Sequence, residues 1–191
     1  MFDSLKDIQP GETIRLHNGT GKILFSREQI RARIRELGKQ LSKQYADNPP
    51  ILVAILRGGF IFQCDLARAS EIPLEVDFLS VSRYDPQEKG VTAVKVLQDL
   101  RSDVRNRNVI VIEGIRTGST KIEYIDSFLK MHNPASIEYA ALVCQAEGRN
   151  KKIPLQYKGF DIGGEFVIGY GLDYLERYRN LPIIAEFTPS S

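Results

Sequence analysis

Residues 109–120, VIVIEGIRTGST, decide the fold of this chain, because they predict a buried strand that leads through a glycine turn into a helix. The apolar run at 109–112 is typical of a buried strand, and the pattern KIEYIDSFLKM after the turn is that of an amphipathic helix. The first N–H groups of a helix are unpaired and lie at the positive end of its dipole. The turn is therefore predicted to bind a phosphate group with Thr117, Gly118, Ser119 and Thr120.

The composition is ordinary for a soluble globular protein. The chain has 191 residues, of which 42% are hydrophobic and 26% charged, which suits one α/β domain spanning 1–191. Its 26 basic and 24 acidic residues give a net charge of +2, so no nucleic-acid partner is expected. No apolar run approaches a membrane span, and the N-terminus lacks the apolar core of a secretion signal. We therefore expect a cytoplasmic protein without a membrane partner.

Strands and helices alternate along most of the chain. Ser26 with Gln29 forms the pattern of a capping box, which predicts a helix from there to about Tyr45. A second helix is predicted at 60–70, after the tight turn at 57–59. Further strands are predicted at 51–56, 74–82, 91–97 and 137–143, with a loop at 83–90 and a turn-rich lead-in at 1–25. The remainder is expected to hold short strands and turns, of which the strand-to-loop unit at 165–171 is the clearest. This order predicts an α/β fold with a doubly wound, mainly parallel central sheet flanked by helices.

Two glycine-containing turns, at 57–59 and 117–120, both follow predicted parallel strands. The carboxyl ends of parallel strands meet at one edge of a sheet, where open α/β proteins bind their ligands. We therefore expect the two turns to form one shared ligand pocket.

Four segments of the chain resemble the hypoxanthine(-guanine) phosphoribosyltransferases, and they occur in the order of that family. They are VAILRGGFIFQCDL, DFLSVSRY, VIVIEGIRTGST and GFDIGGEFVIGYGLDYLERYRNLP, and the resemblance covers nearly the whole chain. It implies a type I phosphoribosyltransferase fold, with a small hood formed by the N- and C-terminal segments. It also implies transfer of phosphoribosyl from phosphoribosyl pyrophosphate to a purine base with the help of Mg²⁺, in a homodimer or homotetramer. The ligands implied are a phosphorylated sugar or a nucleotide.

The resemblance assigns roles around the sugar phosphates. The turn from Thr117 to Thr120 matches the loop that holds the 5′-phosphate, which agrees with the anion site predicted above. Arg57 and Gly58, where the family usually has lysine before the glycine, match the loop that contacts pyrophosphate, and Arg179 matches another pyrophosphate contact. The planar fork of arginine can hold a phosphate by two hydrogen bonds. Asp173 matches the carboxylate that helps to hold Mg²⁺.

The resemblance also assigns the base site and its cover. Phe166 matches the aromatic residue that stacks on the purine, and Val167 matches the position whose backbone reads the edge of the base. Gln145 falls at the family's lysine that donates to the exocyclic oxygen of the purine. Because glutamine can donate or accept, selectivity for 6-oxopurines is no longer assured. A lid that excludes water is expected to begin at Ser82, Arg83 and Tyr84.

The segment before the phosphate turn departs from the family, whose loop reads Glu-Asp-Ile-Ile/Val-Asp-Thr-Gly. There the first two acids hold the ribose hydroxyls, and the later aspartate accepts a proton from the base. Here Glu-Gly-Ile-Arg-Thr-Gly is one residue shorter, so one acid survives: Glu113 keeps the first position, or it takes the second with Arg116 at the third. Glu113 and Arg116 are the candidate catalytic residues. Loss of the proton acceptor would lower the rate by roughly 10²–10⁴-fold.

Three functions stay open at the level of sequence. The first is a working purine phosphoribosyltransferase with altered acid and base groups. The second is an enzyme of a specialised pathway that uses the phosphate turn for a different anionic substrate, gripped by Arg57 and Arg116. The third is a nucleotide-binding homologue without catalysis.

Overall fold

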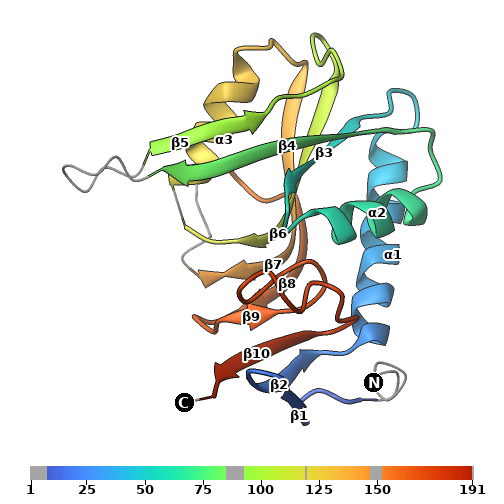
Figure 1. The fold of residues 1–191 in the computed structure, drawn as a ribbon. Helices are drawn as coiled ribbons and strands as arrows, with labels where there is room; N and C mark the ends of the chain where they lie inside the picture. Colours follow the sequence, from blue (N-terminus) through green and yellow to red (C-terminus); the bar gives the residue numbers. More distant parts are fainter. Residues whose placement is uncertain (1–7, 85–92, 119, 147–151, 191) are drawn as a thin grey trace.

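A central sheet organises the chain in its computed structural model, which describes residues 8–84, 93–118, 120–146 and 152–190. Its strands are β3 (Ile51–Leu56), β4 (Glu75–Tyr84), β5 (Ala93–Gln98), β6 (Asn108–Arg116), β7 (Ser136–Gln145) and β8 (Tyr157–Ile162). They lie in the order β5-β4-β3-β6-β7-β8 (Figure 1). All neighbours from β4 to β8 run parallel, and β5 pairs antiparallel with β4 at one edge. The mainly parallel sheet predicted from the sequence is confirmed.

Helices cover both faces of this sheet. α1 (Arg27–Gln44) and α2 (Phe60–Ala69) pack on one face, and α3 (Thr120–Lys130) packs on the other (Figure 1). The predicted capping box begins α1, because the Gln29 backbone N–H donates to the Ser26 hydroxyl and the Ser26 N–H donates to the Gln29 side chain. In the part of the chain that the structure describes, no helix is long and apolar enough to cross a membrane.

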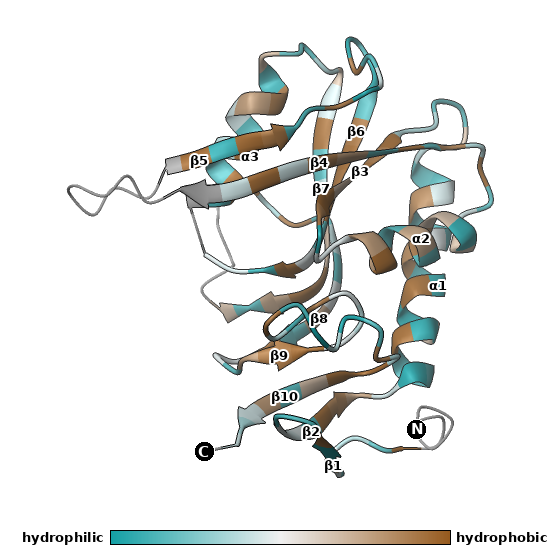
Figure 2. Cartoon of the chain, viewed as in Figure 1, coloured by the Kyte–Doolittle hydropathy of each residue, from teal (hydrophilic) through white to brown (hydrophobic). Residues whose placement is uncertain are grey.

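Strand β6 divides its side chains between the two helical layers. Ile110 and Ile112 are buried with α1 and α2, whereas Val109 and Val111 are buried with α3. Successive side chains of a strand point to opposite faces, so an unbroken apolar run serves both cores. The central strands are accordingly among the most hydrophobic parts of the ribbon (Figure 2).

A second, antiparallel sheet forms the hood that the family resemblance implies. It contains β1 (Thr13–Leu16), β2 (Gly19–Phe25), β9 (Val167–Ile168) and β10 (Ile184–Pro189), in the order β1-β2-β10-β9. The two ends of the chain therefore meet beside one edge of the central sheet (Figure 1). The hood has its own small core, in which Ile23, Ile168, Ile183 and Phe187 are buried.

The structure also differs from the elements expected. The lead-in at 1–25 contains two strands, and the strand expected at 165–171 shrinks to Val167–Ile168. Strand β6 does not end at residue 112 but continues to Arg116, because it keeps its pairing with β7 as far as Cys144. This extension puts Glu113 to Arg116 into the sheet rather than into a loop.

Candidate active site

Three segments meet at the carbonyl group of Gly58, which follows β3. A Cβ atom at Gly114 would lie 2.4 Å from the Gly58 oxygen, and a Cβ atom at Gly171 would lie 2.5 Å from the same oxygen. Real Cβ atoms do not approach a backbone oxygen so closely, so these glycines allow the backbones to touch. Gly171, with φ of 99°, also has a conformation that other residues rarely adopt. The turn after β3, the end of β6 and the segment around 171 are thereby held together. A ligand pocket shared by the turns at 57–59 and 117–120 stays a prediction.

The predicted phosphate turn lies directly after β6 at the carboxyl edge of the sheet. Thr117 and Gly118 leave the strand, and α3 begins at Thr120. Ser119 and the side chain of Thr120 lie outside the described residues. The strand-turn-helix arrangement is the one that the anion site requires, and phosphate binding at this turn stays a prediction.

Four charged side chains lie around the same edge. We call them the Arg57–Arg179 cluster, and its members are Arg57, Asp173, Glu176 and Arg179. Arg179 Nη1 lies 2.8 Å from Asp173 Oδ1 and donates to the Gly171 carbonyl at 2.7 Å. Glu176 accepts from both arginines, from Arg57 Nη2 at 3.1 Å and from Arg179 Nη2 at 3.0 Å. The structure therefore brings together Arg57, Asp173 and Arg179, which the family resemblance had placed around pyrophosphate.

Glu176 is the member of this cluster that the sequence analysis missed. The hydrogen bond from Arg179 lowers the pKa of the Glu176 carboxyl, and together with the charges of Arg179 and Arg57 it outweighs desolvation, which acts in the opposite direction. Its position three residues after Asp173 and three before Arg179 was the available signal, because a tight turn can close such spacings. An adjoining hollow of about 630 Å³ is lined by Arg57, Phe78, Glu176 and Arg179, among others.

The described residues supply few ligands for a metal ion. No group of three or more His, Cys, Asp or Glu side chains is placed to hold one within the described ranges. Asp173 contributes one carboxylate, whose Oδ1 pairs with Arg179 and whose Oδ2 accepts the Glu176 N–H at 2.9 Å. Mg²⁺ is commonly bound through one or two carboxylates together with substrate phosphates. The donor set fits that mode and does not form a cage made by the protein alone.

The candidate catalytic pair, Glu113 and Arg116, lies inside the molecule. Both residues are buried, Arg116 almost completely. Arg116 Nε donates to Glu113 Oε2 at 2.5 Å, and Nη1 lies 3.5 Å from the Ile153 carbonyl oxygen. Among the residues that the structure describes, Nη2 has no hydrogen-bond partner. Burial raises the pKa of Glu113, although Arg116 and Lys121 oppose this effect. Neither side chain presents charge to a ligand at the edge of the sheet.

A change in the alternation of β6 explains where Arg116 points. Strict alternation from Ile112 would place Arg116 on the α1 and α2 side, but Ile115 packs on that side. The Arg116 guanidinium instead lies over the ring of Tyr139, 4.8 Å from its centroid, and Tyr139 belongs to the core beneath α3. The expectation that Arg116 grips a second anion is corrected here, because the core encloses its guanidinium.

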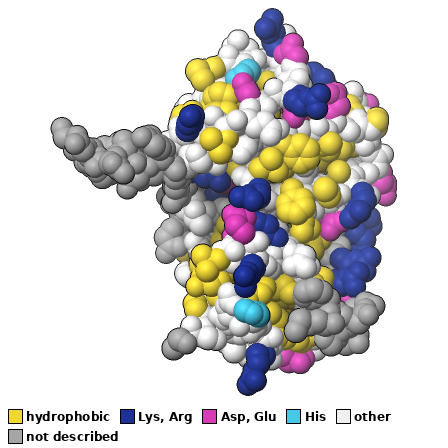
Figure 3. Space-filling model, viewed as in Figure 1, with side chains coloured by type: hydrophobic (Ala, Val, Ile, Leu, Met, Phe, Trp, Pro, Cys, Tyr) yellow, Lys and Arg dark blue, Asp and Glu magenta, His cyan; other side chains and the backbone are white. Residues whose placement is uncertain are grey.

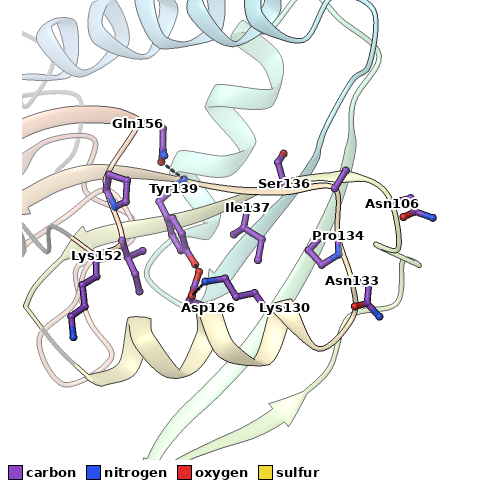
Figure 4. A pocket seen from close by; sticks show the side chains of 13 residues that line it. Asn106, Asp126, Lys130, Asn133, Pro134, Ser136, Ile137, Tyr139, Lys152 and Gln156 are labelled. Atoms are coloured by element: carbon purple, nitrogen blue, oxygen red, sulfur yellow. Dashed lines mark hydrogen bonds and ion pairs between the residues drawn. The ribbon is translucent and has the colours of Figure 1, made fainter.

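The buried pair leads to a polar pocket on the α3 side of the sheet. Tyr139 on β7 points toward α3 and donates to Asp126 Oδ1 at 2.8 Å, and Lys130 lies 2.6 Å from Asp126 Oδ2 (Figure 4). Burial and Asp126 together raise the pKa of the Tyr139 hydroxyl. The pocket has a volume of about 560 Å³ and includes Asn106 and Ser136 at the amino-terminal end of β7. It therefore lies away from the carboxyl edge that carries the phosphate turn.

The predicted base-site residues are close together. Gln145 ends β7, and its Nε2 donates to the Glu165 carbonyl at 3.2 Å. The next residue, Phe166, is 54% exposed and meets Tyr174 edge to face with ring centroids 6.0 Å apart. Val167 is buried in the hood strand β9. An exposed aromatic face held by a neighbouring ring suits stacking on a planar ligand, and the base-binding roles stay predictions.

The beginning of the predicted lid lies in a strand. Ser82 pairs with Lys95, and the backbones of Arg83 and Tyr84 pair with Val94 and Ala93. The expectation of a loop from residue 83 is therefore wrong for these positions, because β5 extends β4 by pairing with it. The rest of the expected lid, 85–90, lies outside the described residues.

Comparisons with known proteins agree with this arrangement. The family model described as "Phosphoribosyl transferase domain" matches residues 22–175. The hypoxanthine phosphoribosyltransferase of Salmonella typhimurium is 36% identical over 169 residues, which cover 87% of this chain and 95% of that protein. A crystal structure of a hypoxanthine phosphoribosyltransferase from Staphylococcus aureus superposes with a TM-score of 0.81 at 36% identity. The aligned part covers 88% of this chain and 91% of the chain in that crystal structure.

A further relative is much longer than this chain. The bifunctional protein TilS/HprT of Listeria monocytogenes is 38% identical over 174 residues, which cover 91% of this chain and 27% of that protein. The chain thus spans about a quarter of the length of that relative.

The chain has the type I phosphoribosyltransferase fold, with a strand-turn-helix unit at the carboxyl edge of a parallel sheet and an antiparallel hood beside it. Within this class, the chain belongs to the hypoxanthine(-guanine) phosphoribosyltransferase family.

Proposed function

We propose that the protein transfers phosphoribosyl from phosphoribosyl pyrophosphate to a purine base. The observation that carries this proposal is the contact at Gly58, which sets the Arg57–Arg179 cluster beside the end of β6 and its phosphate turn. One edge of the sheet then offers backbone N–H groups for the 5′-phosphate, and the exposed Arg57 and the mostly buried Arg179 for the pyrophosphate.

The role proposed for each residue follows from the chemistry of its side chain. Arg57 and Arg179 would bind the pyrophosphate and stabilise its charge as the bond to the sugar breaks. Arg179 is held in place by Asp173 and the Gly171 carbonyl, so little reorganisation is needed when the substrate arrives. Asp173 would hold Mg²⁺ together with substrate oxygens, and the ion would supply further neutralisation of the phosphates. Phe166 would stack on the base.

Proton transfer is where this chain differs from its family. Glu113 is turned into the core, so it offers no carboxylate to the base nitrogen that loses a proton. A positioned acceptor contributes roughly 10²–10⁴-fold to such a reaction. We therefore propose a slow enzyme, whose rate is limited by this lost group rather than by binding.

The direct test is a transfer assay with phosphoribosyl pyrophosphate, Mg²⁺ and each of hypoxanthine, guanine and adenine, following nucleotide and pyrophosphate. We expect nucleotide with at least one base. Phe166→Ala should lower kcat/KM about 10–100-fold, since a stacked base contributes about 1–3 kcal/mol. Tyr124→Ala, at an exposed aromatic residue of α3, is the matched control and should change little.

The competing function is nucleotide binding without catalysis. If the protein binds IMP or GMP and produces no nucleotide from any of the three bases over hours, the proposal is wrong. The purine panel is needed because Gln145 replaces the lysine of the family, and its amide can meet an oxo or an amino group.

A further inference from the structure

Two adjoining hollows lie between α1, α2 and the segment 180–182. Their volumes are about 440 and 280 Å³, and both are lined by Arg31, Asp65, Arg68 and Tyr170. We call the two together the arginine groove. Its lining shares no residue with the hollow beside the Arg57–Arg179 cluster. In the space-filling view, Lys and Arg side chains gather over α1 on this side of the molecule (Figure 3).

Three arginines of α1 enter this groove at every fourth position. Arg27, Arg31 and Arg35 share one side of the helix, about 6 Å apart along its axis. Across the described part of the chain, no carboxylate forms an ion pair with any of the three. Arg33 on the same helix is different, because it bonds Glu36 at 2.6 Å and the Lys158 carbonyl at 2.7 Å. Like charges four residues apart destabilise a helix, so an external anion would relieve this repulsion.

Asp65, the one acid among the described lining residues, does not neutralise the groove. Asp65 is already engaged by its neighbour Arg68 and by the hydroxyl of Tyr170. Counted over the described residues, the lining holds four arginines and one aspartate, which leaves three positive charges. The forked donors of arginine match phosphate oxygens in pairs, and several of them in a groove match phosphates linked in a chain.

The groove and the active site lie on opposite sides of one segment. Tyr170 lines the groove, whereas the next residue, Gly171, touches Gly58 and accepts from Arg179. The hollows are short, and the chain as a whole carries a net charge of only +2. Both facts favour a small ligand over a nucleic acid, which needs a longer basic surface.

We propose that the arginine groove binds the linked phosphates of a small molecule, such as the phosphate chain of a nucleoside di- or triphosphate, at a site separate from the active site. Calorimetric titration with sodium tripolyphosphate tests this on the full chain. Because the Arg57–Arg179 cluster also attracts such an anion, the titration is run on the wild type and on Arg57→Ala/Arg179→Ala. We expect the double variant to retain binding at one site.

Charge reversal within the groove should remove that site. In the Arg57→Ala/Arg179→Ala background, Arg31→Glu/Arg35→Glu should weaken tripolyphosphate binding about tenfold or more, because two charge-assisted contacts are lost. Lys39→Glu/Lys43→Glu makes the same change of charge on exposed residues of α1 outside the groove, and should weaken it by less than about twofold. Transfer activity should be unchanged by Arg31→Glu/Arg35→Glu alone.

Three results would overturn the proposal. One is loss of all tripolyphosphate binding in Arg57→Ala/Arg179→Ala, which would assign every bound anion to the active site. Another is an equal effect of the Lys39→Glu/Lys43→Glu control, which would reduce the groove to general attraction by charge. The last is a ten-nucleotide RNA without terminal phosphates that binds the groove more tightly than tripolyphosphate, which would favour a nucleic-acid surface.

Discussion

Two Arg–Glu ion pairs lie near the carboxyl ends of the neighbouring parallel strands β6 and β3, and they differ in burial. Arg116 and Glu113, at the end of β6, have side chains that are 1% and 9% exposed. Arg57, just after β3, and its partner Glu176 have side chains that are 66% and 57% exposed. The first pair is part of the core and the second can meet a ligand. The chemistry of the residues is the same, so burial alone separates a structural pair from a candidate binding group.

The largest expected effect follows from breaking the buried pair. Glu113→Ala leaves the Arg116 guanidinium buried without a carboxylate, which should lower the free energy of unfolding by about 3–5 kcal/mol. Glu176→Ala is the matched control, because loss of an exposed pair costs less than about 1 kcal/mol. Urea unfolding of both variants gives the comparison. Equal losses would show that the two pairs do not differ in the way described.

The Arg57–Arg179 cluster should instead control activity. Arg179→Ala removes a positioned cation from the pyrophosphate side, and we expect kcat/KM for phosphoribosyl pyrophosphate to fall about 10²-fold. Arg177→Ala, two residues earlier and exposed, should stay within about twofold of the wild type. Steady-state kinetics with varied phosphoribosyl pyrophosphate measures both. A loss confined to the KM of the base would move Arg179 away from the pyrophosphate.

The contact at Gly58 links the two pairs and can be tested by adding one methyl group. Gly114→Ala would place a Cβ atom 2.4 Å from a backbone oxygen, so the turn after β3 must shift. We expect a loss of about 1–3 kcal/mol in unfolding free energy, together with weaker binding of phosphoribosyl pyrophosphate. Gly164→Ala, where nothing lies within 4 Å of the new Cβ, should be silent in the unfolding measurement. A stable Gly114→Ala protein would argue against the tight contact.

Asp77 is a further buried acid that sharpens the comparison, because N–H groups rather than a cation hold its carboxylate. Burial by itself raises the pKa of Asp77, but backbone N–H donors from Ser102, Phe78 and Arg101 outweigh it and lower the pKa. A lowered folded pKa means stability that is present above the unfolded value of about 3.9 and is lost as pH falls through the folded value.

Asp77→Asn should therefore cost about 1–2 kcal/mol at pH 7. The difference in unfolding free energy between the variant and the wild type should become smaller as the pH falls below about 3.9. Unfolding curves at several pH values measure it, with the exposed Asp103→Asn as control. A gap that does not change with pH would mean that the charge of Asp77 contributes nothing.

Much of the fold was predictable because it depends on local patterns. The run ILVAIL predicted β3, and the Ser26–Gln29 capping box predicted the beginning of α1. Strands β1 and β2 were not predicted, and β8 and β10 were expected only as unplaced short strands, since these strands are polar on one side or short and gain their stability from partners far along the chain. Pairing of the two chain ends in the hood is a tertiary event that no window of sequence contains.

The candidate site was predictable to the same degree. Arg57, Asp173 and Arg179 were identified by their resemblance to a family motif, and the structure places them together. The resemblance also suggested a site role for Arg116, which the structure places in the core. A motif fixes residue types and spacing, whereas the direction of a side chain at the end of a strand depends on how that strand is packed.

The sequence by itself determined that 109–120 form a strand, a turn and a helix, because apolar periodicity and the glycine turn act over a few residues. Tertiary structure alone decided that one part of this stretch is buried in the core and another part lies at the edge of the sheet. Glu113 and Arg116 are drawn into the core by the extended pairing of β6 with β7, and the turn from Thr117 onward stays at the edge. The physical reason is that burial depends on neighbouring strands and helices far away in the chain.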